Sequence, residues 1–364
     1  MLLYRDVFFP ILSLLDEERV HNLALRLMRL AGRSARVREA LHNRFAYQDP
    51  RLEVELFGLR FKNPVGFAAG LDKNGIAVPA LAAFGFGFGE VGTVLPIRQP
   101  GEKKPRIWRL AENGVLINRM GFPSDGREVT ARNLSRVNYP NFILWVNVGP
   151  NKESVAAGRT ADDCTAVARR LWKYALAIVI NLSSPNTPGL RDEQRREGLT
   201  RILIHVTSLR DALGWKPILV KLSPDMSWTQ MDEALTTIMN LADGVVAGNT
   251  TISRNGLTSL LCEKPGGASG RILTRRTPQF VEYIYRQTNG RIPIVAVGGI
   301  FTAEDVWQNM TRGATLVEIF TSFVSREGGP SLPGRICYEL SERLDREGIN
   351  SIHEVIGSAA KMNR

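Results

Sequence analysis

The chain has 364 residues, a hydrophobic fraction of 44% and a formal net charge of +11. The length allows one large domain or two ordinary ones, and the apolar fraction is typical of a globular protein with a large core. The charge favours an anionic partner and leaves nucleic acid, anionic lipid and a small anionic substrate open. Cys164, Cys262 and Cys337 show no paired spacing, which argues against a disulfide framework or a structural zinc site and fits a reducing compartment.

The first 45 residues differ in composition from the rest of the chain. They lack the order of a signal peptide, and no apolar run approaches the ~18 residues that would span a bilayer. Residues 7–15 are strongly apolar, and Asp16, Glu17 and Glu18 can begin a helix because acids are favoured at its positive end. Six arginines and no acid lie between Arg19 and Arg38. We predict a helical hairpin that either packs on the rest of the protein or lies on anionic lipid.

Residues 52–61 alternate around Gly58 and predict a small hairpin at the bottom of a barrel. Beyond them, eight apolar runs alternate with amphipathic, helix-like stretches such as 162–177 and 227–241. The runs are near-continuous in Val, Ile, Leu and Ala, as in strands buried on both faces. They cover residues 64–69, 90–94, 142–149, 178–184, 218–223, 244–250, 292–299 and 315–320.

Eight such units match a (β/α)8 barrel in number and length, with a doubly wound open sheet as the alternative. Polar and glycine residues at the ends of the runs favour the barrel, because barrel enzymes place their chemistry at the carboxyl ends of the strands. Those residues are Lys73, Thr93, Asn147, Ser184, Lys221, Asn249 and Gly299.

Residues 181–191 form a polar segment directly after the fourth run. A lone serine such as Ser184 usually caps a helix or forms a turn. The amides of Asn181 and Asn186 change this interpretation, because they offer donors and acceptors that can hold a planar ring with C=O and N–H groups. The charged stretch 192–198 is a candidate for a mobile lid that excludes water.

Lys221 ends the fifth run among apolar neighbours, and a buried lysine needs a partner. The partner is either a reduced flavin, whose negative charge a fixed cation stabilises, or an acid such as Asp225. Gly298 and Gly299 after the seventh run, with Phe320 and Thr321 after the eighth, match the usual phosphate site of such barrels. That site suits FMN or a phosphorylated substrate.

Two further loops offer polar groups. Residues 68–75 contain glycines that permit close approach of the backbone to a cofactor, and Lys73 in this loop can meet a carboxylate. Residues 118–122 add another amide, that of Asn118, before a glycine turn.

Taken together, these segments resemble class 2 dihydroorotate dehydrogenases over residues 4–330. The matching stretches are 63–75, 92–94, 99–101, 104–106, 117–122, 147, 181–191, 221, 249–251, 266–267, 269–270 and 297–300. The resemblance implies oxidation of dihydroorotate to orotate in pyrimidine synthesis, with FMN as the first electron acceptor and a membrane quinone as the second. It also implies that Ser184 is the base for the C5 proton, and Thr187 or a water is our expectation for its proton relay.

The resemblance assigns the remaining site residues by motif. Substrate contacts are Lys73, Asn118, Arg119, Met120, Gly121, Phe122, Asn181, Asn186, Asn249 and Thr250. FMN contacts are Ala69, Gly70, Leu71, Asp72, Lys73, Thr93, Asn147, Asn181, Lys221, Gly248, Gly270, Gly299, Phe320 and Thr321. In the resemblance the N-terminal hairpin forms the quinone tunnel, with His21 and Arg109 as quinone contacts.

Several positions depart from the family pattern. Pro123 and Pro150 replace a common asparagine and lysine, Gly248 stands where a threonine that touches FMN is common, and Phe320 replaces a frequent tyrosine. These changes bear on affinity and on quinone preference rather than on the reaction. Class 1 enzymes have cysteine at the position of Ser184 and lack the hairpin.

The sequence therefore predicts two domains, a membrane and quinone-access extension over 1–45 and an FMN-binding barrel over 46–364. We expect a monomer at the cytoplasmic face of the cell membrane, bound peripherally, without a metal or nucleic acid. One alternative is an FMN barrel that passes electrons to NAD or fumarate. Another is a non-catalytic flavin- or lipid-binding protein.

Overall fold

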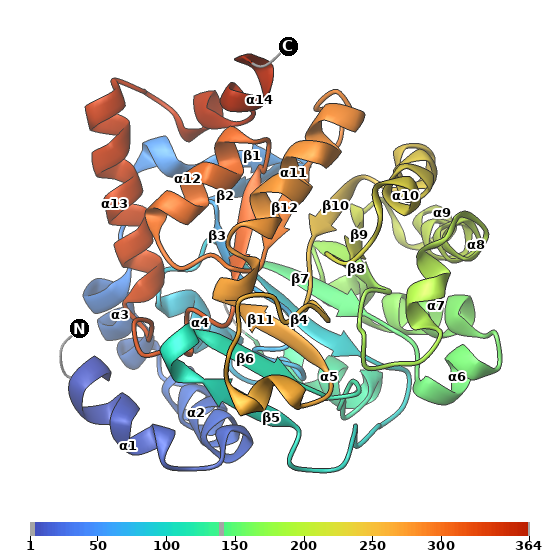
Figure 1. The fold of residues 1–364 in the computed structure, drawn as a ribbon, viewed down its shortest axis with the longest axis horizontal. Coiled ribbons are helices and arrows are strands. Elements are labelled where there is room, and N and C mark those ends of the chain that lie inside the picture. The colour runs from blue at the N-terminus through green and yellow to red at the C-terminus, as the bar shows by residue number, and fades with distance from the viewer. Residues whose placement is uncertain (1–3, 138–141, 363–364) are drawn as a thin grey trace.

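Residues 4–137 and 142–362 are described by the computed structural model, which is built around a closed barrel of eight parallel strands (Figure 1). Each of the eight predicted apolar runs overlaps one of these strands, although β4 and β8 begin before their runs, so the barrel is confirmed and the open sheet is not. In chain order the barrel strands are β3 (Val65–Phe67), β4 (Phe88–Val94), β7 (Ile143–Val148), β8 (Ala177–Asn181), β9 (Ile218–Leu222), β10 (Gly244–Ala247), β12 (Ile294–Val297) and β13 (Leu316–Ile319).

The barrel closes where β13 pairs with β3, with Val317 opposite Val65. Helices cover its outer surface, so the strands are buried on both faces and tolerate apolar residues at successive positions. The wrapping and connecting helices are α4 (Val78–Ala83), α5 (Arg127–Leu134), α6 (Lys152–Ala156), α7 (Thr160–Leu171), α8 (Arg196–Thr207), α9 (Leu209–Leu213), α10 (Trp228–Leu241), α11 (Arg276–Gln287), α12 (Ala303–Thr311), α13 (Leu332–Glu347) and α14 (Ser358–Met362). Short 3-10 turns are η2 (Pro50–Leu52), η3 (Ala111–Asn113), η4 (Trp172–Tyr174), η5 (Leu190–Gln194), η6 (Leu260–Glu263), η7 (Arg271–Leu273) and η8 (Ile352–Val355).

Of the two helices predicted between strands, one matches the structure and the other ends earlier than predicted. The stretch 227–241 is α10, which begins with a capping box between Ser227 and Gln230. The stretch 162–177 is correct only as far as Leu171, because η4 follows α7 and β8 already begins at Ala177.

The predicted hairpin at 52–61 is confirmed as β1 (Val54–Leu56) paired with β2 (Leu59–Phe61). It lies at one end of the barrel, opposite the N-terminal helices in Figure 1. Phe61 is fully buried and packs edge-on against Phe88 and Trp145, with ring centroids 5.5 and 5.9 Å apart. The hairpin therefore closes this end of the barrel with an aromatic cluster.

A second sheet lies at the other end and was not predicted from the sequence. It is antiparallel and consists of β5 (Ile107–Leu110), β6 (Val115–Asn118) and β11 (Gly267–Gly270). Its strands come from insertions after β4 and β10, so they join only in the folded chain. Ile117 and Ala268 of this sheet are fully buried in a small apolar cluster of their own.

The N-terminal segment consists of a π-helical turn η1 (Tyr4–Phe8) and the helices α1 (Phe9–Ser13), α2 (Glu17–Ala31) and α3 (Ala35–Phe45). As predicted, α2 begins after Asp16, whose carboxylate accepts the backbone N–H of Arg19 at 2.8 Å. The predicted hairpin omitted α3. None of the helices that the structure describes is long and apolar enough to cross a bilayer. Residues 1–3, 138–141 and 363–364 of the two predicted domains lie outside the described residues, and the division at residue 45 stays a prediction.

Candidate active site

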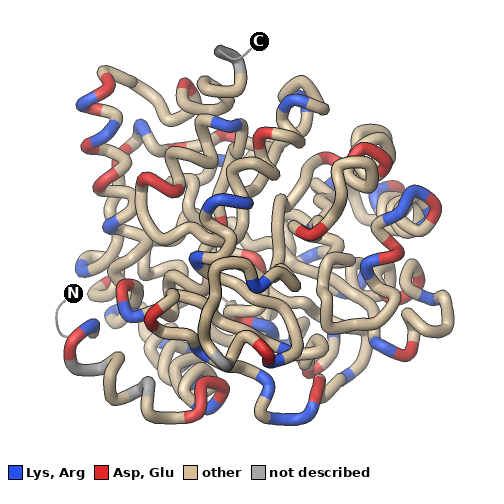
Figure 2. The backbone as a smooth tube through the Cα atoms, in the orientation of Figure 1, with Lys and Arg blue, Asp and Glu red and all other residues tan. Residues whose placement is uncertain are grey.

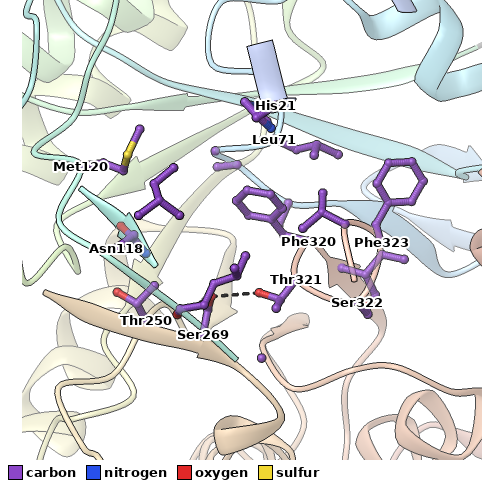
Figure 3. A pocket seen from close by; sticks show the side chains of 18 of the residues that line it. His21, Leu71, Asn118, Met120, Thr250, Ser269, Phe320, Thr321, Ser322 and Phe323 are labelled. Carbon is purple, nitrogen blue, oxygen red and sulfur yellow. Dashed lines mark hydrogen bonds between the residues drawn. The ribbon is translucent and has the colours of Figure 1, made fainter. Parts of the chain in front are cut away.

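A cavity of about 390 Å³ lies at the carboxyl end of the barrel, between the strand ends, the β5–β6–β11 sheet and helix α2 (Figure 3). Twenty-one predicted site residues line it, which places side chains from all parts of the chain in one space. They are His21, Ala69, Gly70, Leu71, Lys73, Thr93, Arg109, Asn118, Met120, Gly121, Phe122, Asn181, Ser184, Asn186, Lys221, Asn249, Thr250, Gly270, Gly299, Phe320 and Thr321.

Four predicted site residues are not among those that line the cavity: Asp72, Arg119, Asn147 and Gly248. The buried carboxylate of Asp72 accepts the backbone N–H groups of the turn that follows it, including that of Ala77 at 2.7 Å. Gly248 has a φ of 123°, and a Cβ on it would lie 2.3 Å from the carbonyl oxygen of Val297. This backbone therefore excludes the threonine that the family pattern suggests.

Ser184 follows β8 and is 6% exposed, with its side chain on the cavity. Its Oγ accepts the backbone N–H of Asn186 at 3.2 Å, which fixes the hydroxyl at the start of a turn. Thr187 is also buried, but within the described part of the chain no hydrogen bond joins it to Ser184. The proton relay from Ser184 therefore stays a prediction.

Beside Ser184, side-chain amides form a connected network. Asn181 donates to Thr93 Oγ1 at 2.9 Å, and its Oδ1 accepts the hydroxyl of Ser183 at 3.0 Å. Asn249 donates to the same Ser183 hydroxyl at 2.7 Å. Because each amide is held by its neighbours, Asn181 and Asn249 have fixed orientations at the cavity wall.

Lys73 supplies a cation on the opposite side of this network. Its Nζ donates to the carbonyl of Gly70 at 2.7 Å. Burial lowers the pKa of Lys73 to about 8, with the nearby positive charge of Arg106 contributing in the same direction and Glu18 opposing it. A buried ammonium with spare donors is suited to a carboxylate ligand.

Lys221 projects from β9 into the barrel, where its Nζ lies 2.7 Å from Glu90 Oε2 and 3.3 Å from Glu318 Oε2. Asp225, the acid considered from the sequence as its partner, instead pairs with Arg191 at 2.9 Å. Burial alone would lower the pKa of Lys221, but the two carboxyl groups outweigh it and raise that pKa. Lys221 is therefore a permanent cation at the floor of the cavity.

Small polar side chains and glycines line the part of the cavity next to the carboxyl ends of β12 and β13. Thr321 donates to Ser269 Oγ at 2.9 Å, the dashed line in Figure 3. The hydroxyl of Ser322 is buried and, in the described structure, has no hydrogen-bond partner. Gly270 has a φ of 98°, a conformation that favours glycine, beside Thr321.

The other end of the cavity reaches helices α1 and α2 and is mainly apolar. His21 faces Phe320 with ring centroids 6.3 Å apart, and Figure 3 shows it beside Leu71. Burial, assisted by the charge of Lys73, lowers the pKa of His21 to about 3, so its ring is neutral. The guanidinium of Arg109 lies 5.2 Å from the ring centroid of Phe9, and its Nε and Nη1 are buried without a hydrogen-bond partner among the described residues.

The predicted lid at 192–198 has a defined structure, spanning η5 and the first turn of α8. Arg191 Nε donates to the carbonyl of Ser183 at 3.0 Å, and its Nη2 donates to that of Thr250 at 3.2 Å. Gln194 is buried and accepts the backbone N–H of Ser223 at 2.9 Å. These contacts anchor the segment to three strand ends, and its movement stays a prediction.

Sequence reasoning missed two polar cavity residues that lie outside the matching stretches, Glu318 and Ser322, and gave no role to Ser269, which lies inside one. Glu318 offered one signal, because it is an acid inside the eighth apolar run. A charge in a strand that is buried on both faces must point into the barrel toward a partner.

Comparisons with known proteins agree with this geometry. The family model described as dihydroorotate dehydrogenase matches residues 51–344. A protein of Deinococcus deserti named dihydroorotate dehydrogenase (quinone) is 42% identical over 98% of this chain and 100% of its own length. A protein of the same name from a Roseiflexus strain is 40% identical over 96% of each chain.

A solved structure with the same architecture is the Eimeria tenella DHODH in complex with ferulenol. It has a TM-score of 0.85 at 34% identity and covers 94% of this chain and 95% of its own. The ligand-free form of that protein has a TM-score of 0.81 at 35% identity, over 88% of this chain and 98% of its own. The chain thus belongs to the dihydroorotate dehydrogenase family, in its quinone-dependent class 2.

Proposed function

We propose that this protein oxidises dihydroorotate to orotate, passing a hydride to FMN and then electrons to a membrane quinone. The observation that carries the proposal is the placement of Ser184 and Lys221 on one cavity. Ser184 follows β8 and Lys221 lies on the neighbouring strand β9, where it is directly opposite Asn181, the last residue of β8. A base for the substrate and a cation for a flavin are thus held side by side.

The residues present fit FMN. The unpartnered hydroxyl of Ser322 and the neighbouring Thr321 and Ser269 suit a phosphate that accepts several hydrogen bonds. Lys221, on the barrel floor, suits a ring system that becomes negatively charged. When bound, FMN supplies a hydride acceptor that is later reoxidised by the quinone.

The residues of the chain account for substrate binding and proton removal. Lys73 would hold the carboxylate of dihydroorotate, while Asn118, Asn181, Asn186 and Asn249 would hold its ring amides. Ser184 would remove the C5 proton. Because a free serine is a poor base, it needs a water or another group to take the proton onward.

The apolar end of the cavity supports a quinone site. Arg109 has two N–H groups without a partner among the described residues, and these can donate to a carbonyl oxygen of a quinone ring. The neutral ring of His21 is hydrogen-bonded to the backbone of Leu71, so its unpartnered Nε2 is an acceptor that suits the O–H of the reduced quinone. Apolar side chains from α1 and α2, including Phe9, Val20 and Leu25, provide a surface for its hydrocarbon part.

The outer surface of the same helices supports peripheral membrane binding at the cytoplasmic face by residues 1–45. Among the described residues, six large apolar side chains of α1, α2 and the turn between them are exposed: Ile11, Leu14, Leu15, Leu23, Leu27 and Leu30. The exposed arginines of α2, Arg19, Arg26 and Arg29, suit anionic headgroups. Along the rest of the backbone, Figure 2 shows Lys and Arg positions interspersed with Asp and Glu positions, a distribution that gives no support to nucleic-acid binding.

Anaerobic titration with dihydroorotate tests the reaction. The flavin absorbance band of the purified protein should bleach and then recover when a quinone is added. Ser184→Ala should keep its flavin and bleach ~10²–10⁴-fold more slowly, as loss of a general base requires. An unchanged bleaching rate would remove Ser184 from its role, and recovery with fumarate or NAD instead of quinone would favour the alternative barrel enzymes.

Vesicle binding tests the membrane proposal. Replacing Leu23, Leu27 and Leu30 by Glu should abolish sedimentation with anionic vesicles while bleaching by dihydroorotate is retained. Ile204→Glu is a matched control, because Ile204 is equally exposed but lies on α8. Equal binding by both variants would contradict a membrane role for α2.

A further inference from the structure

The barrel floor holds two carboxyl groups and one ammonium in a space that excludes water. The side chains of Glu90 and Glu318 are 0% exposed and that of Lys221 is 4% exposed. Lys221 lies closer to Glu90, at 2.7 Å, than to Glu318, at 3.3 Å. Glu90 Oε1 also accepts a hydrogen bond from the amide of Asn147. Glu90 therefore has the surroundings of an ionised carboxylate.

The surroundings of Glu318 differ from those of Glu90. Its Oε1 is buried with no N–H or hydroxyl partner in the described structure. Its other oxygen, Oε2, meets the same ammonium as Glu90, at the longer distance of 3.3 Å. Two carboxyl groups held beside one buried ammonium repel each other when both are ionised, and a proton on one of them removes this repulsion.

A count of charges also indicates that one of the two glutamates carries a proton. With both acids ionised the cluster would carry one net negative charge inside the barrel, and burial of an uncompensated charge costs several kcal/mol. One added proton makes the cluster neutral. Burial and the charge of Glu90 raise the pKa of Glu318 well above its usual range, while Lys221 and Asn147 favour the charged form of Glu90.

We propose that Glu318 is a neutral acid that shares its proton with Glu90, and that this pair sets how strongly Lys221 favours negative charge on the cofactor. Glu318 lines the cavity, so it is a further cofactor-facing residue. With its proton, it leaves the ammonium paired with one carboxylate. Without the proton, a second negative charge opposes electron transfer onto the cofactor. This role rests on the proposed binding of FMN.

The two strands that flank Glu318 place no charged residue beside it in register. On the adjacent strands its partners in register are Gly66 of β3 and Val297 of β12. Among the described residues, the charged groups that act on Glu318 are Glu90 and Lys221. Its protonation therefore depends on this cluster.

Infrared difference spectroscopy on the purified, full-length protein tests the proton directly. At neutral pH the spectrum of the native protein minus that of Glu318→Gln should contain a carboxylic-acid C=O band that shifts in D₂O. The matched control, Glu112→Gln at an exposed glutamate, should remove only carboxylate bands. Carboxylate bands assigned to Glu318 would overturn the proposal.

The variant Glu90→Gln tests whether the proton is shared. Glu318 then becomes the carboxyl partner of Lys221 and should ionise, so the acid band should disappear. An acid band that persists would contradict sharing with Glu90. If Glu318→Gln does not fold, the native protein and Glu90→Gln still give this comparison.

The reduction potential of the bound flavin tests the consequence for the cofactor. At neutral pH, Glu318→Gln should change the reduction equilibrium by less than tenfold, or ~30 mV for two electrons, since a neutral group replaces a neutral group. At alkaline pH the native protein should show an added fall in potential that the variant lacks. A neutral-pH change well above tenfold, or identical pH profiles, would overturn the proposal. Protein purified without flavin would refute the FMN proposal but leave the infrared result valid.

Discussion

Arg106 and Glu18 form a two-pronged ion pair, with Nη2–Oε1 at 2.7 Å and Nε–Oε2 at 3.0 Å. The two residues are 88 positions apart and both are buried. Arg106 directly precedes β5, and Glu18 lies in the first turn of α2. The pair therefore attaches helix α2, which lines the cavity, to the β5–β6–β11 sheet. Its two parallel hydrogen bonds have the planar geometry that arginine and a carboxylate favour.

Glu18→Gln should loosen α2 without unfolding the barrel. Breaking one partner of a buried pair costs ~3–5 kcal/mol, because Arg106 is left without a counter-charge. We expect faster hydrogen exchange in α2, with little change in the barrel strands. The exposed Glu39→Gln is the control, and equal exchange in the two variants would show that the ion pair does not hold the helix.

Lys73 should make orotate binding depend on pH. Its pKa in the folded protein is about 8, against 10.5 for an ordinary lysine. The cation is present below pH 8 and is lost as pH rises through this value, so the Kd for orotate should increase toward alkaline pH. A titration of orotate from pH 6 to pH 10 measures this. Lys73→Met should bind more weakly at pH 6 and show no such dependence.

The lowered pKa of Lys73 also makes the stability of the fold depend on pH. Alkaline pH, which weakens orotate binding, should increase this stability. Between pH 8 and 10.5 the unfolded chain binds more protons at Lys73 than the folded one does, so the free energy of unfolding should increase with pH in this window. Denaturant unfolding at several pH values, native against Lys73→Met, isolates the contribution. A native-minus-variant difference that falls with pH would contradict the assignment.

Gly270→Ala should impair both folding and flavin retention. A Cβ at this position would lie 2.1 Å from the carbonyl oxygen of Gly114 and 2.9 Å from Thr321 Cγ2. Gly158→Ala is a matched control, because Gly158 also has a positive φ but has nothing within 4 Å of its Cβ position. The control should cost ~1–2 kcal/mol of stability, and Gly270→Ala a further ~1–3 kcal/mol. Equal flavin content in both purified proteins would contradict a cofactor contact at Gly270.

Arg109→Leu should weaken the quinone step selectively. Loss of hydrogen bonds from a charged donor costs ~1.5–3 kcal/mol, which corresponds to an increase in the quinone KM of roughly tenfold or more. Anaerobic bleaching by dihydroorotate should keep its native rate, because Arg109 lies at the other end of the cavity from Ser184. A slower bleaching rate in this variant would show that Arg109 serves the first half-reaction.

Much of the fold was predictable because strands buried on both faces leave a local signal. The runs that became β9 and β12 need only their own residues to be recognised. The β5–β6–β11 sheet leaves no comparable signal, since Asn118 and Gly267 pair across an interval that contains four of the eight barrel strands. These strands were therefore not predicted from the sequence.

The site shows the same division. Residues in recognisable motifs, such as Ser184 and Asn181, could be predicted as site residues because they lie at or just after the end of a strand. The partners of Lys221 were not found, because Glu90 and Glu318 lie 131 and 97 residues away in sequence, whereas Asp225 is close in sequence. Barrel closure determines which side chains share the interior, and no local pattern encodes it.

Helix α2 has one face on the cavity, through Val20, His21 and Ala24, and another on the exterior, through Leu23 and Leu27. The wall between the proposed lipid surface and the proposed quinone site is therefore a single helix, ~10 Å thick. An apolar inhibitor that binds at the proposed quinone site would reach that site from within the bilayer. Its effective concentration would be the one that it has in the lipid. Its potency should then follow its lipid–water partition coefficient as well as its fit, and should fall when excess empty vesicles are added.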